Sequence, residues 1–267
     1  MEKLLEVKDL KVSFFTDLGE TQAVKGAGFA IGEGDFFGIV GESGSGKSVT
    51  TKSILRLGPS NCKIMGGEIL FRGEDILKKN EAELREIRGG EIAMIFQDSL
   101  SALNPVYTVG NKMVELIRRH TNMNKKEAKA RVLELLTAVG ITDPEKAMNS
   151  YPHELSGGMR QRVGIAMGMS YQPKLLLADE PTSALDVTTQ AQIVRQMMEL
   201  RDDYGTSIIV VTHNLGIAAY MSDYIVVMKD GKMEDQGTRE YILHETRNAY
   251  TRSLLGAVPS VGGERYV

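Results

Sequence analysis

The sequence predicts an α/β fold in which short buried strands of a parallel sheet alternate with helices. Two fully apolar runs, 175–178 and 207–211, have the length and composition of strands covered on both faces. A third apolar run, 36–40, leads through a glycine-rich loop into 48–57, which lacks Gly and Pro and is predicted to be a helix. The order strand, loop, helix is typical of α/β proteins.

The first 40 residues predict extended segments joined by turns. Their apolar side chains recur at the spacing of strands, at Leu5, Val7, Leu10, Val12 and Phe14. The pair Gly19-Glu20 marks a turn between two such segments. Near the other end of the chain, 224–228 and 233–236 flank a second turn at Asp230-Gly231.

Between about 84 and 172 the pattern becomes helical, which predicts a helical insertion inside one compact unit. An apolar stripe separated by charges follows the helical period at Ala128, Val132, Leu135, Leu136 and Val139. Gly140 is expected to end this helix.

The composition excludes several classes of protein. A net charge of −3, from 32 basic and 35 acidic residues, gives no broad electrostatic reason to bind nucleic acid. One cysteine, Cys62, excludes an internal disulfide or a cysteine-ligated cluster. The N-terminus has no secretory pattern, and no apolar run approaches the roughly 20 residues of a membrane helix. We therefore expect a soluble, intracellular chain whose membrane role, if any, comes through a partner.

The segment 41–48, Gly-Glu-Ser-Gly-Ser-Gly-Lys-Ser, matches the phosphate-binding pattern G-x-x-x-x-G-K-[ST] between a strand and a helix. Glycines let consecutive backbone N–H groups face phosphate oxygens, and the helix adds the positive end of its dipole. Lys47 is expected at the β and γ phosphates and Ser48 at Mg²⁺. The alternative is an ordinary glycine-rich turn, but the position of the segment between a strand and a helix argues against this alternative. The expected nucleotide contacts are Gly41, Ser43, Gly44, Ser45, Gly46, Lys47, Ser48 and Val49.

Two carboxylates, Asp179 and Glu180, follow the apolar run 175–178. An aspartate there can reach Mg²⁺, and the next glutamate can polarise the water that attacks the γ-phosphate. Acidic residues also end strands without having a function. The functional interpretation therefore depends on the phosphate loop being present in the same chain. His213, after the run 207–211, has the same ambiguity, because a lone histidine after a strand is usually structural.

The segment 155–162, Leu-Ser-Gly-Gly-Met-Arg-Gln-Arg, resembles the signature motif of the ABC ATPase family. Ser156, Gly157 and Gly158 would open a helix whose backbone N–H groups form a second anion site. The motif lies about two dozen residues before Asp179, as in that family.

Further motifs of the family follow in order along nearly the whole chain. Gln97 resembles the glutamine that senses Mg²⁺ and the attacking water, which gives Ser48, Gln97 and Asp179 as expected metal ligands. The segment 183–186, ending at Asp186, resembles the loop that crosses between subunits, and His213 resembles the switch histidine. The resemblance thus implies Glu180, His213 and Gln97 as catalytic residues.

An aromatic ring that stacks on adenine is expected at Phe14. The family often has tyrosine there, and Phe15 is the neighbouring alternative. A phenylalanine buried within a strand is the interpretation without function.

The resemblance implies a P-loop NTPase (RecA-like) core with an antiparallel β subdomain and a helical ABC-specific insertion. It places the ATPase domain at 1–250, the insertion at about 98–172 and a short tail at 251–267. In this family two such domains face each other, so that the phosphate loop of one and the signature of the other enclose ATP. The chain would therefore need a second ABC ATPase subunit, with heterodimer and homodimer both open.

The same resemblance implies a place on the cytoplasmic face of the cell membrane, bound peripherally to integral permease subunits. The loop 99–107 is the surface expected to meet them. An extracytoplasmic binding protein would be an indirect partner, and no nucleic acid is expected.

Finer motifs resemble the oligopeptide, dipeptide and nickel uptake branch. They are the segments 97–105, 151–154, 186–192 and 250–259. The departures are Asn248-Ala249 where the branch has His-Pro, and Ser99 where proline is commoner. The cysteine-bearing segment of many relatives has no counterpart, so no iron–sulfur cluster is implied. Oligopeptides, dipeptides and chelated nickel remain open as substrates.

Four other functions compete with import. Relatives in DNA repair usually have a long coiled coil before the signature, and translation-associated relatives have two ATPase units, neither of which this sequence has. A non-hydrolysing partner typically loses the glutamate or the histidine, whereas Glu180 and His213 are both present. An exporter is disfavoured because no membrane domain is fused to this sequence.

Overall fold

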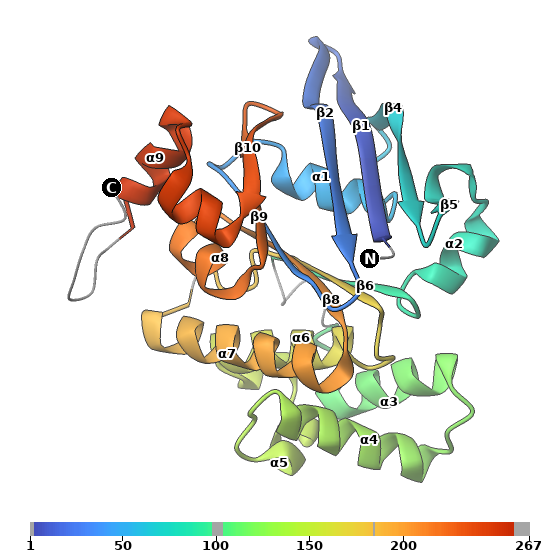
Figure 1. Cartoon of the computed structure of the whole chain (residues 1–267). Helices are drawn as coiled ribbons and strands as arrows, with labels where there is room; N and C mark the ends of the chain where they lie inside the picture. Colours follow the sequence, from blue (N-terminus) through green and yellow to red (C-terminus); the bar gives the residue numbers. More distant parts are fainter. Residues whose placement is uncertain (1–2, 98–103, 184, 259–267) are drawn as a thin grey trace. The chain divides into compact units, whose positions relative to one another are not determined.

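The computed structural model describes residues 3–97, 104–183 and 185–258, which form two compact units (Figure 1). The first unit combines Met1–Arg85 with Ser207–Val267, and the second is Glu86–Thr206. Three expectations fall partly outside the described residues: the loop 99–107 at 99–103, the segment 183–186 at Ala184, and the tail at 259–267.

An antiparallel sheet opens the first unit. Its strand order is β2-β1-β4-β5, and the strands are β1 (Lys3–Thr16), β2 (Gly19–Gly32), β4 (Cys62–Phe71) and β5 (Glu74–Asp75). The turn that joins β1 to β2 lies at 17–18, two residues before the predicted Gly19-Glu20, which instead begins β2. Apolar side chains of β1 such as Leu5 and Leu10 are fully buried, because one face of the sheet covers the core.

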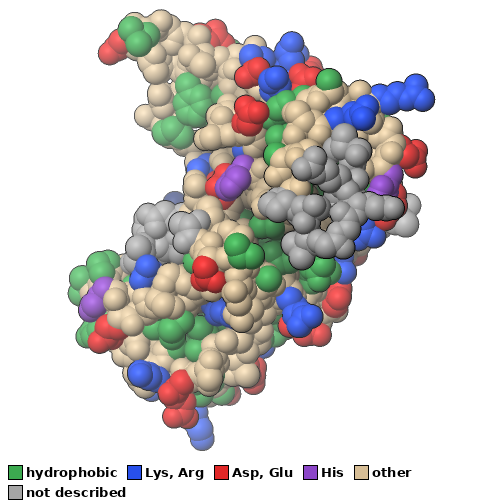
Figure 2. Space-filling view, turned by 90° about the vertical axis from the view of Figure 1, so that its left-hand side faces the viewer, with side chains coloured by type: hydrophobic (Ala, Val, Ile, Leu, Met, Phe, Trp, Pro, Cys, Tyr) green, Lys and Arg blue, Asp and Glu red, His purple; other side chains and the backbone are tan. Residues whose placement is uncertain are grey.

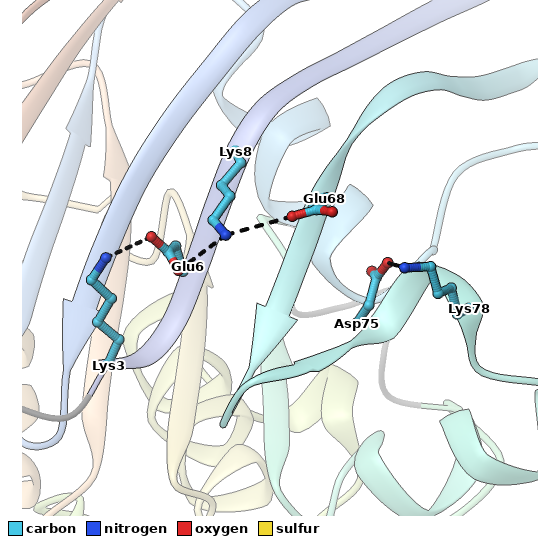
Figure 3. A network of polar contacts seen from close by, with 6 residues as sticks. All are labelled: Lys3, Glu6, Lys8, Glu68, Asp75 and Lys78. Carbon is cyan, nitrogen blue, oxygen red and sulfur yellow. Dashed lines mark hydrogen bonds and ion pairs between the residues drawn. The ribbon is translucent and has the colours of Figure 1, made fainter.

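Charged side chains occupy the exposed face of this sheet (Figure 3). Lys8 is opposite Glu68 in the β1–β4 register, with 3.5 Å between its ammonium and the carboxylate, and it also approaches Glu6 at 3.6 Å. The Lys3 ammonium also forms an ion pair with the Glu6 carboxylate, at 2.6 Å. Water screens such exposed pairs, so they favour one strand register but add little to stability.

A second sheet in the first unit carries the strand–loop–helix motif. The strands of this sheet that belong to the first unit have the order β10-β9-β3-β8, with β3 (Phe36–Val40), β8 (Ser207–Thr212), β9 (Tyr224–Lys229) and β10 (Lys232–Thr238). β3 is parallel to both β8 and β9, and every residue of β3 and β8 is buried. The helices of this unit include α1 (Lys47–Ile54), α8 (Leu215–Met221) and α9 (Ala249–Gly256), with a π-helical turn η3 (Tyr241–Glu245) and the short η1 (Ile76–Lys78).

The second unit holds two parallel strands, β6 (Ile92–Ile95) and β7 (Leu175–Asp179), and most of the helices. These are α3 (Val109–His120), α4 (Lys125–Ala138), α5 (Pro144–Asn149), η2 (Pro152–Glu154), α6 (Gly157–Gly168) and α7 (Val187–Tyr204); α2 (Glu81–Ile87) spans the boundary between the units. The predicted stripe of α4 is buried, Asn124 and Glu127 form a capping box at its start, and Gly140 follows its end with φ of 71°.

Two of the secondary-structure predictions are wrong in part. The segment 84–172 is not wholly helical, because Ile92–Ile95 is strand β6. A four-residue apolar run has no periodicity that distinguishes strand from helix, and its pairing with β7 decides the outcome. The helix predicted over 48–57 ends at Ile54, after which Arg56 has a left-handed φ of 52°.

The described residues include no helix that is both long and apolar enough to span a membrane. On the face drawn in Figure 2, basic and acidic side chains are interspersed rather than gathered by sign. This distribution is in keeping with the small net charge of −3.

Candidate nucleotide site

The phosphate loop lies between β3 and α1 in a conformation that requires glycine. Gly46 is the N-cap of α1 and has a φ of 99°, and a Cβ there would lie 2.6 Å from the Ala23 carbonyl oxygen. A Cβ on Gly41 would lie 2.1 Å from the Met228 carbonyl oxygen. Only residues without side chains therefore let the loop pass so close to the neighbouring backbone.

Backbone hydrogen bonds fix the loop to the turn between β9 and β10. The Gly231 N–H donates to the Ser45 carbonyl at 3.1 Å, and the Lys25 N–H of β2 donates to the Gly231 carbonyl at 2.7 Å. Within the loop, the Ser45 N–H donates to the Glu42 carbonyl at 3.2 Å. The loop is thus held by strands on both sides, which preorganises its backbone for an anion.

Lys47 is 4% exposed, and its ammonium lies inside the loop. It donates to the carbonyl oxygens of Gly41 and Glu42, each at 2.8 Å. These bonds keep a positive charge at the centre of the loop, where phosphate oxygens would be bound. Ser48 follows in the first turn of α1 and is half-buried.

Phe14 and Phe15 are neighbours on β1 whose side chains point to opposite faces of the strand. The Lys63 ammonium lies 5.2 Å from the centre of the Phe15 ring, which occupies that ring with a cation–π contact. Phe14 is half-buried and lies opposite Cys62 of β4. Phe14 therefore remains the better candidate of the two rings for stacking on an adenine.

His213 follows β8 and is exposed. Val40 and Thr212 are partners in the parallel β3–β8 register. The residues that follow them, Gly41 and His213, therefore begin at adjacent strand ends. The Asn214 N–H donates to the Thr212 hydroxyl at 3.1 Å, which fixes the backbone around the histidine. The first unit thus places His213 at the same sheet edge as the phosphate loop.

Gln97 and Glu180 meet in the second unit. Each follows a strand of the β6–β7 pair, whose register joins Ile95 to Ala178. The Gln97 amide donates to the Glu180 carboxylate at 3.2 Å. Asp179, the last residue of β7, is 1% exposed. The sequence predicts these side chains one by one but not the bond between Gln97 and Glu180.

The backbone of Glu180 is in the left-handed region, with φ of 48°. This conformation costs a non-glycine residue roughly 1–2 kcal/mol. The Ser183 N–H and hydroxyl both donate to the Glu180 carbonyl, at 3.2 and 3.0 Å, and hold it in place. The side chain is half-buried.

The predicted signature opens α6. The Ser156 hydroxyl accepts from the Met159 N–H at 3.3 Å, so Ser156 caps the helix in which Gly157 and Gly158 form the first turn. A Cβ on Gly158 would lie 2.8 Å from a methyl of Thr189, whose hydroxyl donates to the Asp186 carboxylate at 2.7 Å. The structure thus brings the signature next to the start of α7, which Asp186 caps.

Arg162, in the same motif, has a structural environment that the sequence does not reveal. Its guanidinium is buried and donates to the Val139 carbonyl at 2.7 Å and to the Gln192 amide oxygen at 2.8 Å. Burial lowers the pKa of this guanidinium. The side chain joins α6 to the end of α4 and to α7.

The candidate residues are divided between the two units. Phe14, the phosphate loop and His213 belong to the first; Gln97, Asp179, Glu180, the signature and Asp186 belong to the second. The three expected metal ligands, Ser48, Gln97 and Asp179, offer hydroxyl, amide and carboxylate oxygens. Oxygen donors of this kind fit Mg²⁺.

Comparisons with known proteins agree over nearly the whole chain. A family model described as ABC transporter matches residues 24–183. The chain is 48% identical over 260 residues to the dipeptide transport ATP-binding protein DppD of Bacillus subtilis (strain 168), covering 97% of this chain and 78% of that one. It is 49% identical over 260 residues to the oligopeptide transport ATP-binding protein OppD of the same strain, covering 97% and 73%.

Solved structures give the same result. The dimeric structure of MJ0796, a bacterial ABC transporter cassette, has a TM-score of 0.79 and 31% identity, covering 88% of this chain and 98% of that chain. A dimeric post-hydrolysis state of the same cassette, bound to ADP and Pi, matches with the same values. The predicted fold class, including the antiparallel subdomain, is confirmed by this likeness.

Proposed function

Because the chain belongs to the ABC transporter family, we propose that it binds and hydrolyses ATP to power a membrane importer of peptides or a related small solute such as chelated nickel. The observation that carries the nucleotide chemistry is the buried Lys47 ammonium, held at 2.8 Å by two carbonyls of the phosphate loop. The relatives DppD and OppD, whose names state dipeptide and oligopeptide transport, support the class of solute.

Nucleotide binding is proposed to rest on the first unit. The backbone N–H groups of the loop and the Lys47 ammonium would contact the phosphates, and Phe14 would stack on the adenine. Ser48, Gln97 and Asp179 would hold Mg²⁺, which supplies charge neutralisation between the β and γ phosphates when bound.

Hydrolysis is proposed to depend on Glu180. Its carboxylate would polarise the attacking water, while Gln97, already bonded to it at 3.2 Å, would orient the same water. His213, at the sheet edge of the phosphate loop, would contact the γ-phosphate. The hydrogen bond with Gln97 holds the carboxylate in one orientation, which would limit where that water can lie.

A second ATPase subunit is proposed to complete the site. Ser156, Gly157 and Gly158 would bind the γ-phosphate of nucleotide held by the partner's loop, with Asp186 near the crossing. The dimeric cassettes of MJ0796, one bound to ADP and Pi, support this arrangement. The partner in turn is either a second copy or a different ATPase subunit.

Membrane partners follow from the same proposal. Integral permease subunits would be bound at the cytoplasmic face, and an extracytoplasmic binding protein would deliver the solute. Closure of the ATPase pair on ATP and its reopening after hydrolysis would then drive the permease.

Steady-state ATP hydrolysis by the purified chain, with and without its partner subunits, tests the proposal. We expect Glu180→Gln to retain MgATP binding and to lower turnover by about 10²- to 10⁴-fold, the scale of a positioned base. Glu199→Gln, an exposed glutamate of α7, is the control for loss of one charge. Equal turnover in the Glu180 and Glu199 variants would contradict the role of Glu180.

Lys47→Ala should weaken MgATP binding itself. Size-exclusion chromatography of Glu180→Gln with MgATP should reveal the nucleotide-stabilised dimer. Unchanged affinity in the Lys47 variant would overturn the phosphate-loop assignment.

A further inference from the structure

The C-terminal segment folds back onto the sheet that carries the phosphate loop. Residues of η3 and α9 join an apolar cluster with α8 and with strands β3 and β9, whose buried members are Val40, Leu215, Ala218, Ala219, Ile225, Val227, Ile242 and Leu255. Val40 immediately precedes Gly41. The end of the chain is therefore packed against the strand from which the loop emerges.

Polar bonds fix the start of α9 in this position. The Asp235 carboxylate of β10 accepts hydrogen bonds from the hydroxyls of Thr246 and Thr251. The Asn248 side chain caps α9 by accepting from the N–H groups of Tyr250 at 2.9 Å and Thr251 at 3.0 Å. Tyr250, in the first turn, thus has a defined backbone position.

The Tyr250 side chain reaches the phosphate loop. Its hydroxyl accepts a hydrogen bond from the backbone N–H of Glu42 at 3.2 Å, and the Lys229 ammonium lies 4.6 Å from the centre of its ring. Burial raises the pKa of this phenol; the backbone hydrogen bond from Glu42 opposes that shift, and the nearby Glu42 carboxylate adds to it. The hydroxyl therefore stays protonated at neutral pH.

One peptide group connects Tyr250 to Lys47. The Tyr250 hydroxyl accepts a hydrogen bond from the Glu42 N–H, and the Lys47 ammonium donates one to the Gly41 carbonyl at 2.8 Å. This N–H and this carbonyl belong to the same planar peptide group. A rotation of this peptide would disrupt both bonds. The Lys47 ammonium donates to the Gly41 and Glu42 carbonyls, so the orientation of the Gly41–Glu42 peptide contributes to the direction of the ammonium.

We propose that Tyr250 is a positioning residue of the nucleotide site, whose hydroxyl holds the Gly41–Glu42 peptide and thereby orients Lys47 for the phosphates. The C-terminal segment then contributes to nucleotide affinity without touching the nucleotide. This role rests on the proposed ATP-binding function. A purely structural tyrosine would change stability and leave affinity as it is.

Tyr250→Phe tests the role because it removes the hydroxyl and keeps the ring on Lys229. Tyr220→Phe, an exposed tyrosine of α8, is the matched control. Titration calorimetry with MgADP, which avoids turnover, measures affinity in the full chain, and thermal unfolding measures stability. We expect the Kd of Tyr250→Phe to rise about three- to tenfold, the effect of one hydrogen bond, with Tm within about 2 °C of the unchanged protein.

Two results would overturn the inference in different ways. A Kd within twofold of that of Tyr220→Phe, whatever the Tm, would show that Tyr250 has no positioning role. If the unsubstituted chain bound no MgADP, the proposed nucleotide function would itself be wrong, and the inference would fall with it.

Discussion

Arg162 offers a quantitative test of how the signature helix is held. Arg162→Met keeps the apolar stem but removes the guanidinium and its bonds to Val139 and Gln192. The Val139 carbonyl is buried, so the loss of a charged donor there costs roughly 1.5–3 kcal/mol, whereas water replaces the bond to the exposed Gln192.

Burial lowers the pKa of Arg162, because folding removes water from the guanidinium. Arg162→Met avoids the free-energy cost of this desolvation, which offsets part of the loss. We therefore expect a net loss of about 1–3 kcal/mol in the free energy of unfolding.

Urea unfolding followed by far-ultraviolet circular dichroism measures this loss. Arg195→Met, an exposed arginine of α7, is the control and should change stability by less than about 0.5 kcal/mol. If the two variants were equally stable, the reasoning that Arg162 joins α6 to its neighbours would be refuted. A more stable Arg162→Met would mean that desolvation outweighs both bonds.

Two further predictions concern a half-buried phenol and a glycine. Burial raises the pKa of Tyr171, which donates to the Leu116 carbonyl, so the folded state holds this proton more tightly than the unfolded state does. Its contribution to stability is present below the unfolded pKa of about 10 and is lost as pH rises above it, and unfolding of Tyr171→Phe between pH 9 and 11 should show a weaker alkaline loss. Gly46→Ala should lower Tm more than Gly73→Ala: both have positive φ, but only the first puts a Cβ 2.6 Å from a carbonyl oxygen. Equal Tm values would remove the argument from close approach.

The sequence predicted most of the sheet because burial on both faces leaves a signal in composition alone. The runs 175–178 and 207–211 became β7 and β8 within one residue at their ends. Strand β6 was missed because its four residues are too few for a period and only the pairing with β7 defines them.

Local conformation was predictable where a motif has a local mechanism, as in the glycine loop around Lys47. Side chains that act through distant partners were not. Nothing local to Tyr250 indicates that it lies against Glu42, 208 positions away, and nothing in the signature indicates that Arg162 reaches the end of α4. Such contacts depend on the packing of whole elements, for which a single sequence has no signal.

The left-handed backbone at Glu180 has a consequence for protein engineering. A glycine or asparagine adopts this conformation at lower cost, so replacing the glutamate would stabilise the fold even as it removes the carboxylate. On the proposed role of Glu180 in hydrolysis, random screening for thermal tolerance would thus tend to recover chains of low turnover altered at this position. A library that keeps residue 180 unchanged avoids that outcome. The search is then directed to surface positions where a gain in thermal stability does not lower turnover.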